Sequence, residues 1–273
     1  MSGGTASPIH FMEVAVDAAR EAGAILLSEA DRPVKISYKG EVDLVTEADR
    51  KSEAAIVVRL RSHFPQHAIM GEEGGEGGAP EGARYRWYVD PLDGTTNFAH
   101  SYPCFAVSIG LLEESQPLIG VVLDPSRGEL FTAMRGEGAY LNSKRIHVSN
   151  VKELSKSLVA TGFPSHKRTS NPNMNYYWQF TLHSHGVRRD GSAALDLCSV
   201  ACGRFDGFWE FGLKSWDTAA GTLLIREAGG TVTHFNGHPF QPGDYEILAS
   251  NGHIHSEMQK LAAEIAEQAA NKV

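Results

Sequence analysis

The stretch Trp87-Tyr-Val-Asp-Pro-Leu-Asp-Gly-Thr-Thr-Asn-Phe98 places two carboxylates, Asp90 and Asp93, after an apolar strand and directly before a Gly-Thr-Thr turn. Two ionised carboxylates about 4 Å apart repel by roughly 4 kcal/mol at an effective dielectric near 20, so a shared site needs a cation or a proton. Hard oxygen ligands favour Mg²⁺ or Mn²⁺. If a helix begins here, the amides of Gly94 and Thr95 can face an anion, because first-turn amides lack intrahelical partners. The stretch therefore predicts adjoining cation and anion sites.

Composition and net charge argue against several classes of function. The chain has 273 residues, a formal net charge of −8 and a pI near 5.8, with no Lys/Arg block, which argues against a general nucleic-acid or membrane-surface binder. There is no secretory pattern and no apolar run approaching the roughly 18 residues of a membrane helix, so we expect a cytoplasmic protein. Cys198 and Cys202 lie one helical turn apart without nearby His, which favours buried helix residues over a metal or redox pair.

Helical and strand patterns alternate without an internal repeat or long linker. Apolar spacing predicts helices over 10–29 and 46–62, with Thr46 and Asp49 in a capping pattern. Between 104 and 141, β-rich runs broken by Pro and Gly turns predict an antiparallel meander. The second half predicts strands near 157–161, 205–211, 231–234 and 246–249, and helices near 192–202, 216–228 and from about 254. The Gly-rich stretch 71–82 predicts a mobile loop, either a solvated connection or a catalytic lid.

Acidic residues gather at four predicted strand ends or helix starts: Asp43 with Asp49, Glu72 with Glu73, Asp90 with Asp93, and Asp217 after Trp216. An isolated Asp at a helix start is typically an N-cap, and by that interpretation Asp217 would simply begin a helix. Hydrolysis of a phosphate monoester, however, uses two cations about 3.5–4 Å apart, and these need several carboxylates. The combination therefore favours a metal site that acts on phosphate.

These motifs resemble those of the Mg²⁺-dependent, lithium-sensitive phosphatases typified by inositol monophosphatase. The matching stretches follow the family's order and approximate spacing: Asp43-Leu-Val-Thr-Glu-Ala-Asp49, Gly71-Glu-Glu73, Asp90-Pro-Leu-Asp-Gly-Thr-Thr-Asn-Phe98, Gly191-Ser-Ala-Ala194 and Trp216-Asp-Thr-Ala-Ala-Gly221. The resemblance implies an α/β fold, a layered α/β/α/β/α sandwich with a largely antiparallel first sheet. It implies one catalytic domain over 1–273 with two tightly packed halves of about 1–150 and 151–273, and a homodimer.

The resemblance also implies a set of metal ligands. Glu72, Asp90 and the Leu92 carbonyl would hold a first Mg²⁺, and Asp90, Asp93 and Asp217 a second, with Asp90 bridging the two. A third, loosely held ion near Glu72 belongs to the family pattern, and Mn²⁺ could substitute. Lithium inhibition would follow from a small cation entering the site around Asp217, and unchanged turnover in tens of millimolar lithium would count against it.

Catalytic and phosphate-binding roles follow from the same resemblance. Water on the first metal, held by Glu72, would attack the phosphate, and the Thr95 hydroxyl would bond to that water and to Asp49. A helix N-cap is the alternative role for Thr95, and the two roles are compatible. The Gly94 and Thr95 amides would hold the phosphate, and Asp93 and Asp217 would also contact the substrate, with no covalent enzyme intermediate. Lys39 matches a basic position near the metals, although a solvated lysine is an equal alternative.

Substrate choice depends on groups around the leaving alcohol. Glu210 matches an acidic residue that contacts inositol hydroxyls in the family. Its charge would repel a second phosphate. The alternative interpretation of Glu210 is an exposed carboxylate at a strand end. Ala193 matches a position whose backbone approaches the ring, and tight helix packing is its alternative. The sequence therefore predicts an Mg²⁺-dependent inositol monophosphatase that also acts on related polyol or sugar monophosphates. The alternatives are a phosphatase for another monoester, such as histidinol phosphate, or a regulatory module associated with protein or RNA; direct nucleic-acid binding is disfavoured by the acidic balance.

Overall fold

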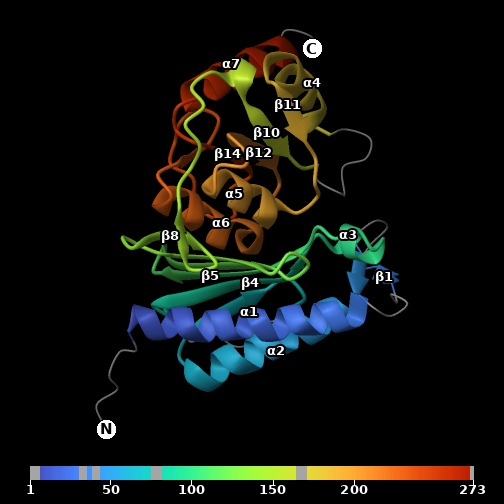
Figure 1. Ribbon diagram of the computed structural model, residues 1–273, viewed down its shortest axis with the longest axis vertical. Helices are drawn as coiled ribbons and strands as arrows, with labels where there is room; N and C mark the ends of the chain where they lie inside the picture. The colour runs from blue at the N-terminus through green and yellow to red at the C-terminus, as the bar shows by residue number, and fades with distance from the viewer. Residues whose placement is uncertain (1–6, 31–35, 39–43, 75–81, 164–170, 271–273) are drawn as a thin grey trace.

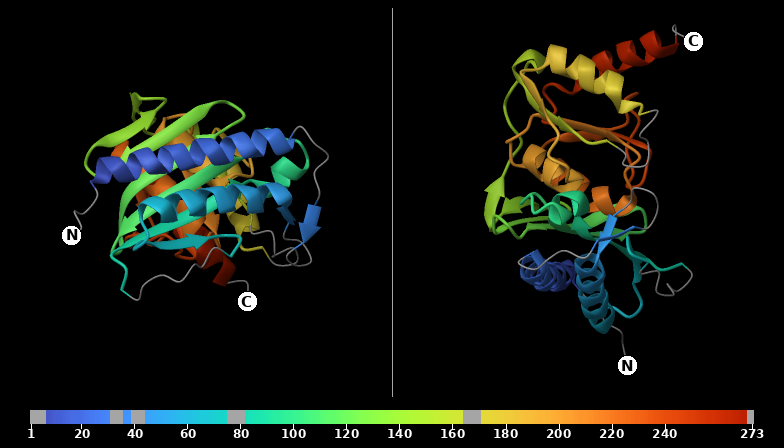
Figure 2. Two further views of the ribbon diagram at one scale, coloured as in Figure 1. Left: turned by 90° about the horizontal axis from the view of Figure 1, so that it is seen from below. Right: turned by 90° about the vertical axis from the view of Figure 1, so that its right-hand side faces the viewer.

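The computed structural model of the chain describes residues 7–30, 36–38, 44–74, 82–163 and 171–270, and these form alternating layers of helices and sheets (Figure 1). Two helices lie outermost on one side, followed by a seven-stranded sheet, two central helices, a five-stranded sheet and two more helices. The same order of layers is seen from the side in Figure 2. The α/β/α/β/α sandwich expected from the sequence is therefore confirmed.

The seven-stranded sheet is largely antiparallel, since only its first pair of strands is parallel. Its strands follow one another in chain order: β3 (Ala68–Gly71), β4 (Tyr85–Asp93), β5 (Ala106–Glu113), β6 (Gln116–Asp124), β7 (Glu129–Met134), β8 (Gly138–Leu141) and β9 (Lys144–Ile146). Strands β5 to β8 are the meander that the sequence predicted. A register shift between Asp90 and Asp93 interrupts the pairing of β4 with β5, at the stretch with which the sequence analysis began.

Helices α1 (Pro8–Ala30) and α2 (Glu47–His63) cover one face of this sheet. The buried residues of α1 recur at helical spacing from Phe11 to Leu26, so one stripe of the helix meets the sheet. Helix α2 begins after Thr46, and Asp49 closes a capping box with it, as the sequence predicted.

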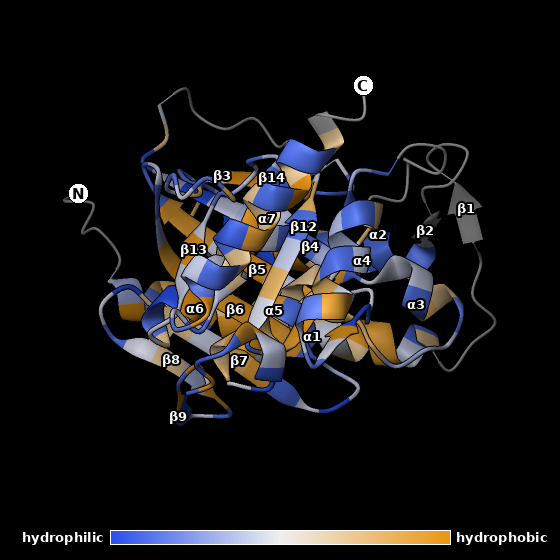
Figure 3. Cartoon of the chain, turned by 90° about the horizontal axis from the view of Figure 1, so that it is seen from above, coloured by the Kyte–Doolittle hydropathy of each residue, from blue (hydrophilic) through white to orange (hydrophobic). Residues whose placement is uncertain are grey.

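The central strands β5 and β6 are buried on both faces, because α6 (Ser215–Glu227) covers the side opposite α1. They are therefore apolar almost throughout, and appear mostly orange in Figure 3. Gly110 and Gly120 are paired in register across these strands, and both face α6. A Cβ on Gly110 would lie 2.6 Å from the Ala219 Cβ, and one on Gly120 would lie 2.8 Å from the Ala220 carbonyl oxygen. The two glycines thus allow α6 to lie directly on the sheet.

The five-stranded sheet is mixed and follows the spatial order β11 (Gly186–Arg188), β10 (Leu158–Thr161), β12 (Gly207–Phe211), β14 (Glu246–Ser250) and β13 (Thr231–Thr233). Helices α5 (Ala193–Ala201) and α6 lie between the two sheets. Helices α4 (Asn173–His183) and α7 (His255–Ala270) cover its outer face. The remaining elements are short: β1 (Ile36–Tyr38), β2 (Leu44–Thr46), α3 (Thr95–Ala99) and a 3-10 turn over Leu154–Lys156.

Most elements predicted for the second half are present within one or two residues of their expected bounds. The sequence analysis missed α4 and the short strands β1, β2, β9 and β11. Cys198 is a buried residue of α5 as expected, whereas Cys202 follows the last helical residue and is only partly buried. No helix in the described ranges is long and apolar enough to cross a bilayer.

The contact of α6 with the first sheet yields a stability prediction. Gly120→Ala should lower the free energy of unfolding by about 1–3 kcal/mol, because its methyl group would press on the backbone of Ala220. Gly186→Ala is the matched control, since a Cβ there meets side chains at ordinary contact distance, 3.5 Å or more. Urea unfolding of both variants checks the prediction, and equal stability of the two would contradict it.

Candidate active site

Asp90 lies near the end of β4 and is only 2 % exposed. Its Oδ1 accepts a hydrogen bond from the Leu92 amide at 3.0 Å, across the irregular segment that follows. Ser52 of α2 donates to the Pro91 carbonyl at 2.9 Å and so fixes this segment from below the sheet. The break in strand pairing, a common feature beside active sites, lets the chain turn so that Asp93 faces a different element from Asp90.

Asp93 faces the start of α5. Its Oδ2 accepts hydrogen bonds from the Ser192 hydroxyl and from the Ala194 amide, both at 2.6 Å. Ser192 is also the N-cap of α5, because its hydroxyl oxygen accepts from the Leu195 amide at 3.3 Å. Asp93 is therefore bonded to the first turn of a helix that lies between the two sheets.

Asp217 reaches the site from α6. It is the third helical residue, and its Oδ2 accepts from the Lys214 amide at 2.6 Å, so it stabilises the helix start without being the N-cap itself. Ser108 of β5 donates to the Trp216 carbonyl at 3.2 Å, and the same Ser108 is paired with Asp90 in the sheet. Strand β5 thus connects the position of Asp217 to that of Asp90.

Glu72 lies in the turn directly after β3, and its amide bonds to the Val89 carbonyl at 3.2 Å. The turn is held by Glu53 of α2, whose Oε2 accepts from the Glu73 amide at 2.8 Å. The carboxylate of Glu53 also occupies the space where a side chain at Gly71 would lie. The glycine that precedes Glu72 is therefore required by the packing of a buried acidic residue.

Thr95 begins the short helix α3 and lies beside Asp49. Its hydroxyl is 3.2 Å from Asp49 Oδ1 and 3.0 Å from the Leu92 carbonyl, so it has two possible acceptors for one proton. Asp49 Oδ2 accepts from both the amide (2.8 Å) and the hydroxyl (2.6 Å) of Thr46. The N-cap role considered for Thr95 is wrong, because Gly94 holds that position with φ +95. A Cβ on Gly94 would lie 2.8 Å from the Cys104 carbonyl, so only glycine fits.

The acidic side chains strongly affect one another's ionisation. Burial raises the pKa of Asp90 well above its ordinary value, and the charges of Glu72, Asp93 and Asp217 add to that effect. Burial and the charge of Asp93 raise the pKa of Asp217 to about 8. Burial also raises the pKa of Asp93, although its bonds to Ser192 and Ala194 oppose the rise. The site therefore concentrates more negative charge than its protein surroundings can compensate.

These carboxyl groups form an all-oxygen donor set that fits a hard divalent cation. Among the described residues, no three acidic, His or Cys side chains are already drawn together into a closed ligand group. Asp93 and Asp217 each direct Oδ2 to a backbone amide, and the side chains of Asp217 and Asp90 also interact directly. A divalent cation would offset the negative charge of these groups.

The residues predicted to surround the leaving alcohol lie on the second half of the chain. Glu210 is near the end of β12 and is 7 % exposed, so the alternative of an exposed strand-end carboxylate is excluded. Burial raises its pKa to about 8, and the charges of Asp217 and Asp93 contribute. Ala193 is the first residue of α5 and is buried, adjacent to the two residues that bond Asp93.

Some residues named in the sequence analysis lie outside the part of the chain that the structure describes. They are Lys39, Asp43 and residues 75–81 of the Gly-rich stretch. Conversely, the sequence analysis missed Ser52 and Glu53, which hold the Pro91 and Glu73 segments. The available signal was their spacing, because Asp49, Ser52 and Glu53 place polar groups on the buried side of α2.

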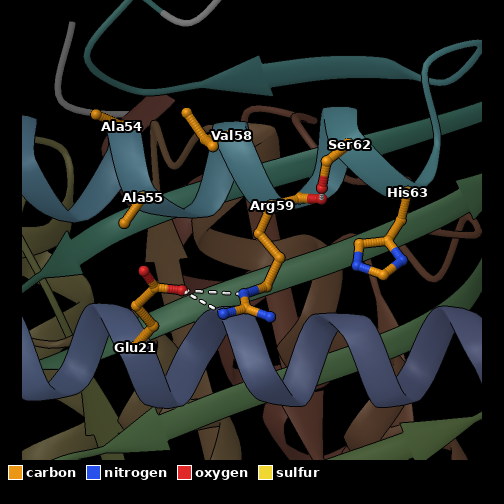
Figure 4. A pocket seen from close by; sticks show the side chains of 7 residues that line it. All are labelled: Glu21, Ala54, Ala55, Val58, Arg59, Ser62 and His63. Carbon is orange, nitrogen blue, oxygen red and sulfur yellow. Dashed lines mark hydrogen bonds and ion pairs between the residues drawn. The ribbon is translucent and has the colours of Figure 1, made fainter.

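A groove of about 470 Å³ runs between α1 and α2, on the far side of the first sheet from α6. It is crossed by the ion pair of Glu21 with Arg59, whose guanidinium Nη2 is 2.7 Å from Oε2, and Figure 4 shows Val58 and His63 on its rim. None of the predicted site residues lines this groove. The candidate active site is a separate place, at the carboxyl end of β4.

The fold and this acidic site point to a class of phosphatase, and comparisons identify the family. A sequence profile of the inositol monophosphatase family matches residues 9–271, and the chain belongs to this family of phosphatases. The chain is 48 % identical over 257 residues to the inositol-1-monophosphatase of Synechocystis sp., covering 93 % of this chain and 89 % of that protein. It is 49 % identical over 249 residues to Nus factor SuhB of Pseudomonas aeruginosa, covering 89 % of each. The inositol monophosphatase of Anabaena superposes with a TM-score of 0.84 at 45 % identity, over 93 % of this chain and 96 % of that one.

The concentration of carboxyl groups predicts a cation-dependent stability. Mg²⁺ at 100 times its Kd should stabilise the wild-type protein by about 2.7 kcal/mol. Asp90→Asn removes one of four mutually repelling acidic groups. Without metal, the variant should therefore be at least as stable as the wild type. With Mg²⁺, the variant should show little of the stabilisation expected for the wild type. Thermal unfolding with Mg²⁺ and with EDTA measures both effects. An equal Mg²⁺-induced shift in the variant would contradict the assignment of Asp90.

Proposed function

We propose that the protein is a Mg²⁺-dependent phosphatase that hydrolyses inositol monophosphate and related polyol or sugar monophosphates. The observation that carries this proposal is the convergence of Asp90, Asp93, Asp217 and Glu72 beside a hydroxyl and carboxylate pair, Thr95 and Asp49. The family match and the relatives named inositol monophosphatase support it.

The metal-holding roles follow the donor set. Glu72, Asp90 and the Leu92 carbonyl would hold one ion, and Asp90, Asp93 and Asp217 another. When bound, Mg²⁺ supplies Lewis-acid chemistry, which strengthens water as a nucleophile at neutral pH and offsets charge on the phosphoryl and leaving oxygens. In the absence of a cation the same carboxyl groups repel one another.

Thr95 and Asp49 would orient the attacking water. A hydroxyl that accepts a hydrogen bond from water can donate its own proton to Asp49 Oδ1, which lies 3.2 Å away. Asp49 is fully buried and its other oxygen is held by Thr46, so the carboxylate has little freedom to turn. The pair therefore provides an acceptor for the proton of the nucleophile, as in general-base catalysis.

The phosphate and the alcohol would lie on opposite sides of Asp93. Gly94 and Thr95 begin α3, where amide groups without intrahelical partners face outward and can bind phosphate oxygens. Ala193 and Glu210 lie on the other side, toward the second sheet, where Glu210 would accept hydrogen bonds from the alcohol. We expect Glu210 to disfavour bisphosphates by charge repulsion.

A second candidate function is regulation through protein or RNA contact. The observation that favours it is the similarity to proteins named Nus factor SuhB, which are 45–49 % identical to this chain over 231–249 residues. The net charge of −8 favours a protein partner over direct RNA binding. This role is compatible with phosphatase activity, and the homodimer expected from the family stays a prediction.

Phosphate release tests the catalytic proposal directly. With Mg²⁺, purified protein should hydrolyse inositol 1-phosphate in preference to histidinol phosphate, fructose 1,6-bisphosphate and 3′-phosphoadenosine 5′-phosphate. Asp93→Asn should lose most turnover while keeping a native unfolding transition, because the change preserves shape and removes charge. Preference for another ester would overturn the interpretation of Glu210, and turnover on none would favour the regulatory candidate.

The role of the Thr95 hydroxyl can be separated from packing. Thr95→Val keeps the shape of the side chain and removes its proton donor, so kcat should fall by about 10²–10⁴. Thr95→Ser keeps the hydroxyl and should stay within about tenfold of the wild type. Steady-state kinetics of the two variants provide the comparison, and similar losses in both would assign Thr95 to packing alone.

A further inference from the structure

Two buried carboxyl groups near the site are left over after the metal-holding roles have been assigned. Asp196, in the first turn of α5, is 2 % exposed, and Glu210 is 7 % exposed. Neither carboxyl group makes a hydrogen bond or a close ion pair with any described residue, in contrast to Asp49 or Asp93. Buried polar groups normally have partners, so two adjacent exceptions require an explanation.

The oxygens of Asp196 and Glu210 are not fully enclosed. Within the described ranges, no fully enclosed side-chain nitrogen or oxygen lacks a hydrogen-bond partner, so the oxygens of Asp196 and Glu210 must border accessible space. Burial raises the pKa of Asp196, and the charges of Asp190, Glu210 and Asp93 add to this effect while Arg189 opposes it. Asp196 therefore shares one local environment with Glu210 and Asp93.

The backbone beside Glu210 is shaped to hold its carboxyl group. A Cβ on Gly162, directly after β10, would overlap both oxygens and the carboxyl carbon of Glu210. The carboxylate thus lies flat against the backbone at the end of the second sheet. On α5, Asp196 follows Ala193 by three residues, so it lies on the same helix face one turn further in.

We propose that Asp196 is a further specificity-determining residue, which binds a hydroxyl of the leaving alcohol beside the hydroxyl bound by Glu210. The inference rests on the proposed phosphatase function and defines its substrate class as esters of alcohols with at least two further hydroxyls. A hydroxyl group provides the partner that each buried carboxyl group lacks, whereas an apolar leaving group leaves both unsatisfied and costs binding energy.

The test compares two substrates that differ in the hydroxyls of the leaving group. The kcat/KM values for inositol 1-phosphate and p-nitrophenyl phosphate are measured for the wild type, Asp196→Leu and Asp196→Asn. Loss of one hydrogen bond should lower the ratio of the two values by about tenfold in the Leu variant, mainly through the KM for inositol 1-phosphate. The Asn variant, which keeps one acceptor oxygen and the shape of the side chain, should recover part of the ratio.

Asp124→Asn is the matched control, because Asp124 is as buried as Asp196 but is bonded to Arg127. It should leave the ratio unchanged. An unchanged ratio in both Asp196 variants, or an equal loss on both substrates, would overturn the assignment. A wild-type enzyme that hydrolyses both esters without preference would refute this inference and leave the phosphatase proposal standing. No hydrolysis of either ester would refute the phosphatase proposal itself.

Discussion

Mutual repulsion among buried carboxyl groups is the constraint on which the rest of this structure depends. Asp90, Asp93 and Asp217 come from different elements, and burial together with neighbouring charge raises the pKa of each. Such a cluster has a high free energy when no cation is bound and a much lower one when a divalent cation is present. The fold therefore has to hold these groups together against their repulsion, and the hydrogen bonds of the site are arranged for that purpose.

Three sets of contacts hold the carboxyl groups together. Helix α6 lies directly on β5 and β6 because Gly110 and Gly120 have no side chains, and this approach sets the position of Asp217 above Asp90. The start of α5 bonds Asp93, so the first sheet and a central helix meet at one carboxylate. Helix α2 supports the site from the opposite face through Asp49, Ser52 and Glu53. The site thus joins the outer helix α2, the first sheet and the central helices α5 and α6, and a local change in any one of them should alter the geometry of the others.

Much of the fold could be predicted from the sequence, because apolar periodicity marks α1, a capping pattern marks the start of α2, and clear turn residues bound the strands of the β5–β8 meander. Helix α4 was missed since its sequence, Asn173-Met-Asn-Tyr-Tyr-Trp-Gln-Phe-Thr-Leu-His183, has no charged face to mark a helical period. The acidic motifs predicted the candidate site, because a metal site of the proposed kind restricts residue type and spacing. The same reasoning passed over Glu53 and Asp196, whose significance depends on burial and on partners from distant segments. Similarly, the left-handed backbone of Gly94 and its contact with Cys104 are tertiary facts that a Gly-Thr-Thr turn alone does not reveal.

The most direct test of this account is a crystal structure of the protein grown with Mn²⁺ and measured at the manganese absorption edge, where the ion gives an anomalous signal. The account predicts anomalous peaks between Asp90, Asp93, Asp217 and Glu72, with carboxylate oxygens about 2.0–2.3 Å from each ion. It also predicts that these peaks vanish in crystals of Asp90→Asn grown under the same conditions. Strong peaks elsewhere and none among these four carboxyl groups would contradict the claim that the site is built around a divalent cation.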